Sequence, residues 1–212
     1  MVNKVTTATV IGLEAYKITV EIDVLNSLPG ISIVGLPDAA INEARDRVRS
    51  AVKNSGYTFP AKKVIINLAP ADLKKVGTNY DLPIAVGILT EEGAIDTEKI
   101  TDYAFIGELS LDGELRRVNG VLPLVLGLKS FGIKNVVVPK INAAEAALVE
   151  GINVYGAANL AEVVNHFIEE PLKLVKSDIN SYLTHLKEEE YIYDFKDVKG
   201  QKKAKKALEI AA

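Results

Sequence analysis

The amino-acid sequence predicts an α/β (α+β) fold in which helices pack over a mixed sheet. Three observations predict it: alternating apolar and polar residues open the chain, helical periodicity begins near Asp38, and strand patterns then alternate with helix patterns. Such alternation is typical of a sheet covered by helices. The 212 residues, 48% of them hydrophobic, suffice for one well-buried domain and a remainder too short for a second.

The first quarter of the chain is predicted to form a meander followed by a helix. Residues 5–11, 15–25 and 31–34 show the two-residue period of strands, and we expect them to form an antiparallel meander. Asp38 suits a helix start and Gly56 suits a helix stop. Apolar residues between them share one helical face, so the sequence predicts an amphipathic helix over 38–55.

Strands and helices alternate over residues 63–168. The predicted strands are 63–68, 103–108, 115–118, 135–139 and 153–155, and the predicted helices are 82–91, 121–131, 143–150 and 160–168. Asp112-Gly113 predicts a hairpin turn before residues 115–118. The charged stretch 169–193 has no strand pattern, and we expect a linker with one helix over 178–190.

Composition excludes several kinds of chemistry. The chain has no cysteine, which excludes disulfides, thiolate metal sites and cysteine nucleophiles. It has no apolar run of about 20 residues and no signal-peptide pattern, so we expect a cytoplasmic protein without a membrane partner. The two histidines, His166 and His185, lack a nearby carboxylate motif, and we expect no metal site.

A formal net charge of −3 is not typical of a generally basic nucleic-acid-binding protein, so any contact with a polyanion must be local. Three small basic spots are candidates for contacting DNA: a helix flank, a loop that adds an aromatic residue, and a pair after the predicted hairpin. Their residues are Arg45, Arg49 and Lys53; Lys74, Lys75 and Tyr80; and Arg116 and Arg117. Each spot has an alternative interpretation. The helix flank and the pair after the hairpin could simply be solvated surface, and the loop could simply be a turn that starts the next helix.

Several motifs together resemble a known family. They are VGLPDAA at 34–40, RDRVRSA at 45–51, NLAPADLKK at 67–75, DLPIA at 81–85 and GELSLDGELR at 107–116. They resemble the N-terminal domain of the magnesium-chelatase-like AAA+ ATPases of the YifB/ComM type, and the similarity continues through residues 194–212. The resemblance implies a fold like that of the Lon proteolytic domain over 1–168, a linker over 169–193, and the start of an ATPase module over 194–212, with the chain truncated before the Walker A loop.

The resemblance also implies a function. Members of the family are ring-forming motors that act on DNA, including branch migration during natural transformation. We therefore expect a non-catalytic accessory domain, with DNA as partner and a hexameric homo-oligomer as the parent protein. ATP and Mg would be bound by the parent and no cofactor by this fragment. The alternative is a peptide-gripping domain of a chelatase-like ATPase that remodels proteins.

Individual residues can be compared with the family and with Lon. Val198, Gly200 and Gln201 match the segment that packs on the adenine base in similar ATPases, although here the nucleotide site would be incomplete. Asn79 stands where Lon has its nucleophilic serine, and Leu122 where it has its lysine. An amide and an isobutyl group cannot form a nucleophile–base pair, so we expect no catalytic residue. A displaced pair of Thr78 with Lys74 or Lys75 remains an alternative.

Overall fold

The structure is a computed structural model that describes residues 2–12, 14–179 and 194–211. Two units are distinguished, Met1–Asp178 and Ile179–Ala212. Each is considered by itself.

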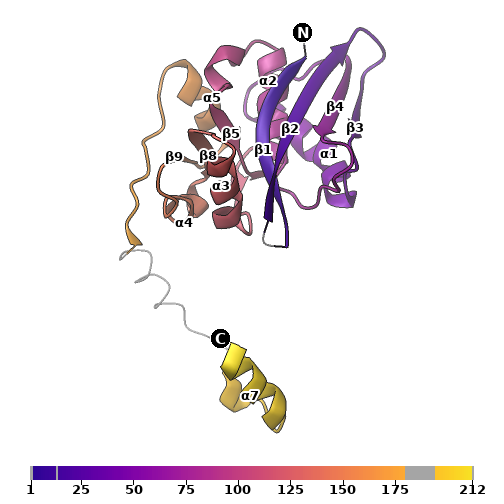
Figure 1. Cartoon of the computed structure of the whole chain (residues 1–212). Helices are drawn as coiled ribbons and strands as arrows, with labels where there is room; N and C mark the ends of the chain where they lie inside the picture. The colour runs from indigo at the N-terminus through magenta and orange to yellow at the C-terminus, as the bar shows by residue number, and fades with distance from the viewer. Residues whose placement is uncertain (1, 13, 180–193, 212) are drawn as a thin grey trace. The chain divides into compact units, whose positions relative to one another are not determined.

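A seven-stranded mixed sheet forms the centre of the first unit (Figure 1). From one edge to the other its strands are β3 (Gly30–Val34), β4 (Lys63–Ala69), β2 (Glu14–Leu25), β1 (Asn3–Ile11), β5 (Tyr103–Phe105), β8 (Asn135–Pro139) and β9 (Asn153–Ala157). β2 is antiparallel to both β1 and β4. The other four pairs are parallel. The predicted fold class, a mixed sheet covered by helices, is confirmed.

The third strand corrects the predicted meander. β1 and β2 form the expected antiparallel pair, but β3 does not continue it: it lies at the sheet edge, parallel to β4. Helix α1 (Ala39–Asn54) connects these two strands. A helical connection of this length returns the chain in its original direction, which makes β3 and β4 parallel.

Helices cover both faces of the sheet and create two apolar clusters. On one face lie α1, α2 (Asp81–Glu91) and α5 (Leu160–Ile168), and on the other lie α3 (Val121–Ser130) and α4 (Ala143–Ala146). Val5 of β1 belongs to the first cluster and Ala8 to the second, as expected when successive strand side chains point to opposite faces. Both are fully buried.

Most predicted boundaries agree with the structure to within one or two residues. The helices predicted over 38–55 and 160–168 correspond to α1 and α5. The strand predicted over 103–108 is divided, because β5 joins the large sheet while β6 (Glu108–Leu109) pairs with β7 (Leu115–Arg116) as a separate hairpin. α4 is shorter than the predicted helix over 143–150.

The chain itself covers one edge of the sheet. The Val175 amide donates to the carbonyl oxygen of Val154 at 2.9 Å, and Leu174 forms an isolated antiparallel bridge with Tyr155. The segment 172–175 therefore lies along β9. No helix within the described ranges is long and apolar enough to cross a membrane.

In the second unit, a short 3-10 helix (Phe195–Asp197) precedes α7 (Lys202–Ala211). Asp194 begins the first of these with a capping box shared with Asp197. The helix predicted over 178–190 lies almost entirely outside the described residues.

Candidate functional site

Helix α1 carries both the apolar face that fixes its position and the basic residues predicted from the sequence. It begins at Asp38, whose Oδ1 accepts a hydrogen bond from the Ile41 amide at 2.8 Å. Asp38 therefore satisfies one of the amides that a helix start leaves without a partner. The buried side of the helix consists of Ile41, Ala44, Val48, Ala51 and Val52.

One flank of α1 is joined to the start of α2 by an ion pair. Arg47 donates from Nε to Asp81 Oδ2 at 2.8 Å and from Nη2 to Oδ1 at 3.1 Å. The Leu109 amide also donates to Oδ2, at 3.2 Å. The Asp81 side chain is fully buried, and this burial raises the pKa of Asp81 to about 6 against the opposing effects of Arg47 and the Leu109 amide.

Sequence reasoning missed this ion pair. A signal for it exists, since Asp81 is an acidic residue at the head of a helix whose next residues are almost all apolar. An acid in that position either caps the helix or meets a counter-charge. That counter-charge is Arg47, which lies 34 residues earlier on another helix, and only the three-dimensional structure identifies it.

The loop before α2 is bound to the loop before α1. The Lys75 amide donates to the Leu36 carbonyl at 3.2 Å, and the Asp38 amide donates to the Lys75 carbonyl at 3.2 Å. Asp38 Oδ2 accepts from the Gly77 amide at 3.1 Å. The two loops that contain VGLPDAA and NLAPADLKK are thus one connected structure.

This docking corrects two of the predicted DNA contacts. Lys75 is fully buried, and its Nζ donates to the carbonyl oxygen of Pro70. Tyr80 is also fully buried, and burial raises the pKa of its hydroxyl to about 12. Because both side chains point into the molecule, Lys75 offers no charge to a polyanion and Tyr80 offers no ring for stacking. Lys74 is the exposed cation of this loop.

A polar cavity of about 230 Å³ lies where α2 begins. The Thr78 hydroxyl donates to Oε2 of Glu108, and Glu108 Oε1 lies 3.6 Å from Arg116 Nη1. The cavity is lined by Val76, Gly77, Thr78, Asn79, Glu108, Arg117, Val118 and Asn119. It therefore offers both hydrogen-bond donors and acceptors to a small ligand.

The cavity lacks the pair that a Lon-like peptidase needs. The Asn79 amide donates to the carbonyl oxygen of Ala8 at 3.2 Å, and Leu122 on α3 is apolar. The displaced alternative is not formed either, because Thr78 donates to Glu108 while the Lys75 ammonium donates to Pro70. No hydrogen bond joins Thr78 to Lys74 in the part of the chain that the structure describes. The side chains of Thr78 and Asn79 are thus both engaged in hydrogen bonds within the domain.

Arg45, Arg49 and Lys53, here named the basic ribbon, occupy the other flank of α1. All three are exposed, and none pairs with an acidic residue of the described ranges. Arg45 Nε donates to the Asn42 carbonyl at 2.8 Å, and the Arg49 guanidinium carbon lies 5.8 Å from the ring centre of Phe59. Since Arg47 faces α2, which covers β1 and β2, the basic ribbon faces the β3 edge.

The remaining basic candidates lie elsewhere. Arg116 is paired with Glu108, and Arg117 lines the polar cavity. These two residues are exposed but lie on the side of α1 that carries Arg47. The structure therefore brings Arg116 and Arg117 together and separates them from the basic ribbon.

Val198, Gly200 and Gln201, the residues that the resemblance assigns to a nucleotide site, all lie in the second unit. All three are exposed. Gly200 and Gln201 have φ values of 74° and 48°, so the chain makes a left-handed bend just before α7.

His166 is held in place by hydrogen bonds and by neighbouring aromatic rings. Its Nδ1 accepts from the Leu172 amide at 2.8 Å, and its Nε2 lies 3.1 Å from the Tyr103 hydroxyl. The rings of Tyr103, Tyr155 and Phe167 surround it. His185 lies outside the described residues. Within the described ranges, no three His, Asp or Glu residues are grouped so that they could hold a metal ion.

The sequence of the chain is similar to those of several known proteins. A family model described as subunit ChlI of Mg-chelatase matches residues 20–142. Competence protein ComM of Haemophilus influenzae is 40% identical over 202 residues, 95% of this chain and 39% of ComM. YifB of Salmonella typhimurium is 41% identical over 211 residues, 97% of this chain and 40% of YifB. DNA repair protein RadA of Bacillus subtilis is 33% identical over 109 residues, 43% of this chain and 24% of RadA. The chain thus spans about two fifths of the length of ComM and of YifB.

Proposed function

Because this chain belongs to the family of the ChlI subunit of Mg-chelatase, we propose that it is a non-catalytic accessory domain of an ATP-driven motor that acts on DNA. The observation that carries the proposal is the basic ribbon. It is an exposed row of three cations that no acid of the described residues neutralises.

The spacing of the basic ribbon suits a phosphate backbone. Residues four apart on a helix are separated by about 6 Å along its axis. The charges of one strand of duplex DNA advance by about 3.4 Å per step along the duplex axis, and adjacent phosphates are farther apart than this through space because the strand also winds around the axis. Arg45, Arg49 and Lys53 can therefore lie opposite successive phosphates of one strand. Such contacts position a protein on DNA without reading its sequence.

The parent protein is proposed to be a cytoplasmic, ring-forming homo-oligomer, a hexamer, that binds ATP and Mg and promotes branch migration or strand separation in transformation or recombination. Two similar proteins support the link to DNA by their names, a competence protein and a DNA repair protein. Val198, Gly200 and Gln201 would contribute to the nucleotide site only together with the rest of an ATPase module. The ring would multiply the weak contacts of one ribbon by placing several on one DNA molecule.

Fluorescence anisotropy with labelled single-stranded and forked DNA, at 50 and 200 mM salt, tests the DNA contact. Three phosphate contacts predict a slope of log K against log salt of about −2 to −3. The Arg49→Ala/Lys53→Ala variant should reduce this slope by about two thirds. Lys17→Ala, an exposed lysine on β2, is the matched control and should leave the slope unchanged. Affinity that is independent of salt, or equal in the ribbon and control variants, would contradict the proposal.

The alternative is a domain that grips peptides for a protein-remodelling ATPase. The polar cavity favours it, since the cavity keeps hydrogen-bonding groups where Lon-like enzymes have a catalytic pair. Recovery of protein clients without nucleic acid from the full-length parent, together with no salt-dependent DNA binding, would favour this alternative.

A further inference from the structure

The β3 edge of the sheet has an unpaired backbone. β3 neighbours only β4 in the sheet. The Gly30 amide points to β4, where it donates to the Lys62 carbonyl at 3.4 Å. In a parallel pair, alternate residues direct both backbone groups to the same neighbour. The amides and carbonyls of Ile31 and Ile33 therefore face outward, two residues apart, as strand addition requires.

Among the described residues, one edge of the sheet is covered by another segment of the chain and the other edge is not. At β9 the segment 172–175 lies along the edge and donates the Val175 amide to Val154. β3 has no such cover among the described residues, and the sequence Gly30–Val34 contains neither charge nor proline. Proteins usually protect exposed edges with charged residues, proline or a bulge. The unprotected β3 edge is therefore available to another extended chain.

A hollow of about 440 Å³ lies at the beginning of this edge. It is lined by residues 27–32 together with Lys63. Leu28, one of the lining residues, is 88% exposed and offers an apolar surface there. The hollow can accept an aliphatic side chain, and Lys63 can meet a carboxylate next to it.

The positive charges around the β3 edge favour an acidic segment over a second copy of the chain. Lys62 and Lys63 are exposed and form no ion pair with a described residue, and the basic ribbon faces the same edge. A second copy paired through β3 would bring two basic ribbons towards each other, and like charges at close range cost energy. An acidic chain instead gains from Lys63, which lines the hollow, and from Lys62 next to it.

We propose that the β3 edge binds an extended acidic segment of a partner polypeptide by strand addition. The backbone of the segment pairs with Ile31 and Ile33, an aliphatic side chain enters the hollow beside Leu28, and acidic side chains meet Lys62 and Lys63. Main-chain bonds supply affinity in this mode, and alternate side chains supply specificity. The site is separate from the proposed DNA contact and does not depend on it.

The test uses the 212-residue chain and a capped, fluorescent seven-residue peptide of alternating valine and glutamate. We expect saturable binding, and slowed hydrogen exchange of the Ile31 and Ile33 amides by NMR. A peptide with lysine in place of glutamate should bind at least tenfold more weakly. N-methylation of the peptide amides that pair with β3 should abolish binding, whereas methylation of the intervening amides should not.

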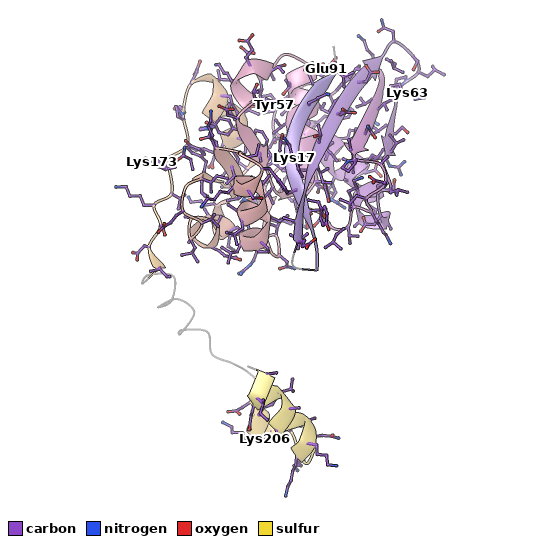
Figure 2. All side chains as sticks on the ribbon, in the orientation of Figure 1. Lys17, Tyr57, Lys63, Glu91, Lys173 and Lys206 are labelled. Carbon is purple, nitrogen blue, oxygen red and sulfur yellow. The ribbon has the colours of Figure 1, made fainter. Side chains whose placement is uncertain are left out.

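Two charge-reversal variants complete the test. Lys63→Glu should weaken binding of the acidic peptide at least tenfold, while Lys173→Glu should not change it. Both lysines are exposed, and Figure 2 shows them at opposite sides of the first unit. Ribbon variants that abolish DNA binding should leave the protection of the Ile31 and Ile33 amides intact, so the two proposals fail separately.

Three outcomes would overturn the proposal. One is absence of protection at Ile31 and Ile33 at millimolar peptide. A second is equal binding of both N-methylated peptides. The third is a concentration-dependent dimer in sedimentation that Leu28→Asp dissociates and the peptide does not, which would assign the edge to a second copy.

Discussion

Arg47 and Asp81 lie 34 residues apart, and a two-point ion pair joins them between the side of α1 and the first residue of α2. Asp81 is fully buried and Arg47 is 18% exposed, so the pair lies where water reaches only one partner. It connects the RDRVRSA and DLPIA motifs. The Leu109 amide, from the GELSLDGELR motif, donates to the same carboxylate.

Removing the cation should destabilise the domain strongly. Arg47→Met leaves the Asp81 carboxylate buried without its counter-charge, and we expect a loss of about 3 kcal/mol in the free energy of unfolding. The double variant Arg47→Met/Asp81→Asn should recover part of that loss, because no charge then remains buried. Urea unfolding of both single variants and the double variant measures the coupling, and strictly additive changes would show that the pair contributes nothing.

Asp81 should also give the stability a characteristic pH dependence. Its pKa is raised to about 6 in the folded protein, against about 3.9 in an unfolded chain. The folded state therefore holds this proton more tightly, and the resulting stabilisation is complete below pH 4 and lost as the pH rises through 6. The unfolding free energy of the wild type relative to Asp81→Asn should fall by about 2 kcal/mol between pH 4 and 7. A difference that rises over this range would contradict the assignment.

Acid should release the segment that covers β9. Burial lowers the pKa of His166, so folding favours its neutral form. Nδ1 accepts from the Leu172 amide only while that nitrogen is unprotonated. The stabilisation that neutral His166 gives to the folded state is complete above pH 6.5 and is lost as the pH falls through the lowered pKa of this residue. The protection factor of the Leu172 amide, measured by NMR hydrogen exchange, should fall below pH 6. An unchanged protection factor at pH 5 would argue against a role for this bond.

Gly35 should not tolerate a side chain. Its φ is 97°, and a Cβ there would lie 2.3 Å from the Leu68 carbonyl oxygen of β4. Gly12 also has a positive φ, of 65°, but a Cβ there would meet nothing within 4 Å. Gly12→Ala should therefore cost only the backbone strain of about 1 kcal/mol, while Gly35→Ala should cost at least about 3 kcal/mol. Equal unfolding midpoints for the two variants would refute the close contact.

The polar cavity should not form a covalent acyl or phosphonyl enzyme. The Thr78 hydroxyl donates to Glu108, and the Lys75 ammonium donates to the carbonyl oxygen of Pro70. Treatment with a fluorophosphonate probe should leave the intact mass unchanged, in the wild type and in Thr78→Ala alike. A mass increase that Thr78→Ala removes would establish a nucleophile in this cavity.

Local patterns predicted the elements well because their signals are local. Asp38 and Gly56 mark the limits of α1 through capping and left-handed backbone, and the structure has both features. The partner of β3 could not be predicted in the same way, since an alternating pattern identifies a strand but not its neighbour. The helix between β3 and β4 contained the missing information, because such a connection favours a parallel pair.

The candidate site was predicted only in part, for a related physical reason. The spacing of Arg45, Arg49 and Lys53 follows from helix geometry, so sequence alone places them on one flank. Lys75 and Tyr80 belong to a loop, where no periodicity distinguishes inward from outward side chains, and both proved to be buried. The backbone of Lys75 is held by hydrogen bonds to the loop before α1, more than 30 residues earlier, which no local pattern shows.

The order of the strands determines how far apart the two edges of the sheet lie. β3 and β9 are the two outermost of the seven strands, and six spacings of about 4.8 Å place them about 29 Å apart. The basic ribbon lies towards the first of these strands, and the chain runs along the second as it nears Asp178. The cations of the basic ribbon and the segment that leads to Asp178 are therefore held at opposite edges, separated by the full breadth of the sheet.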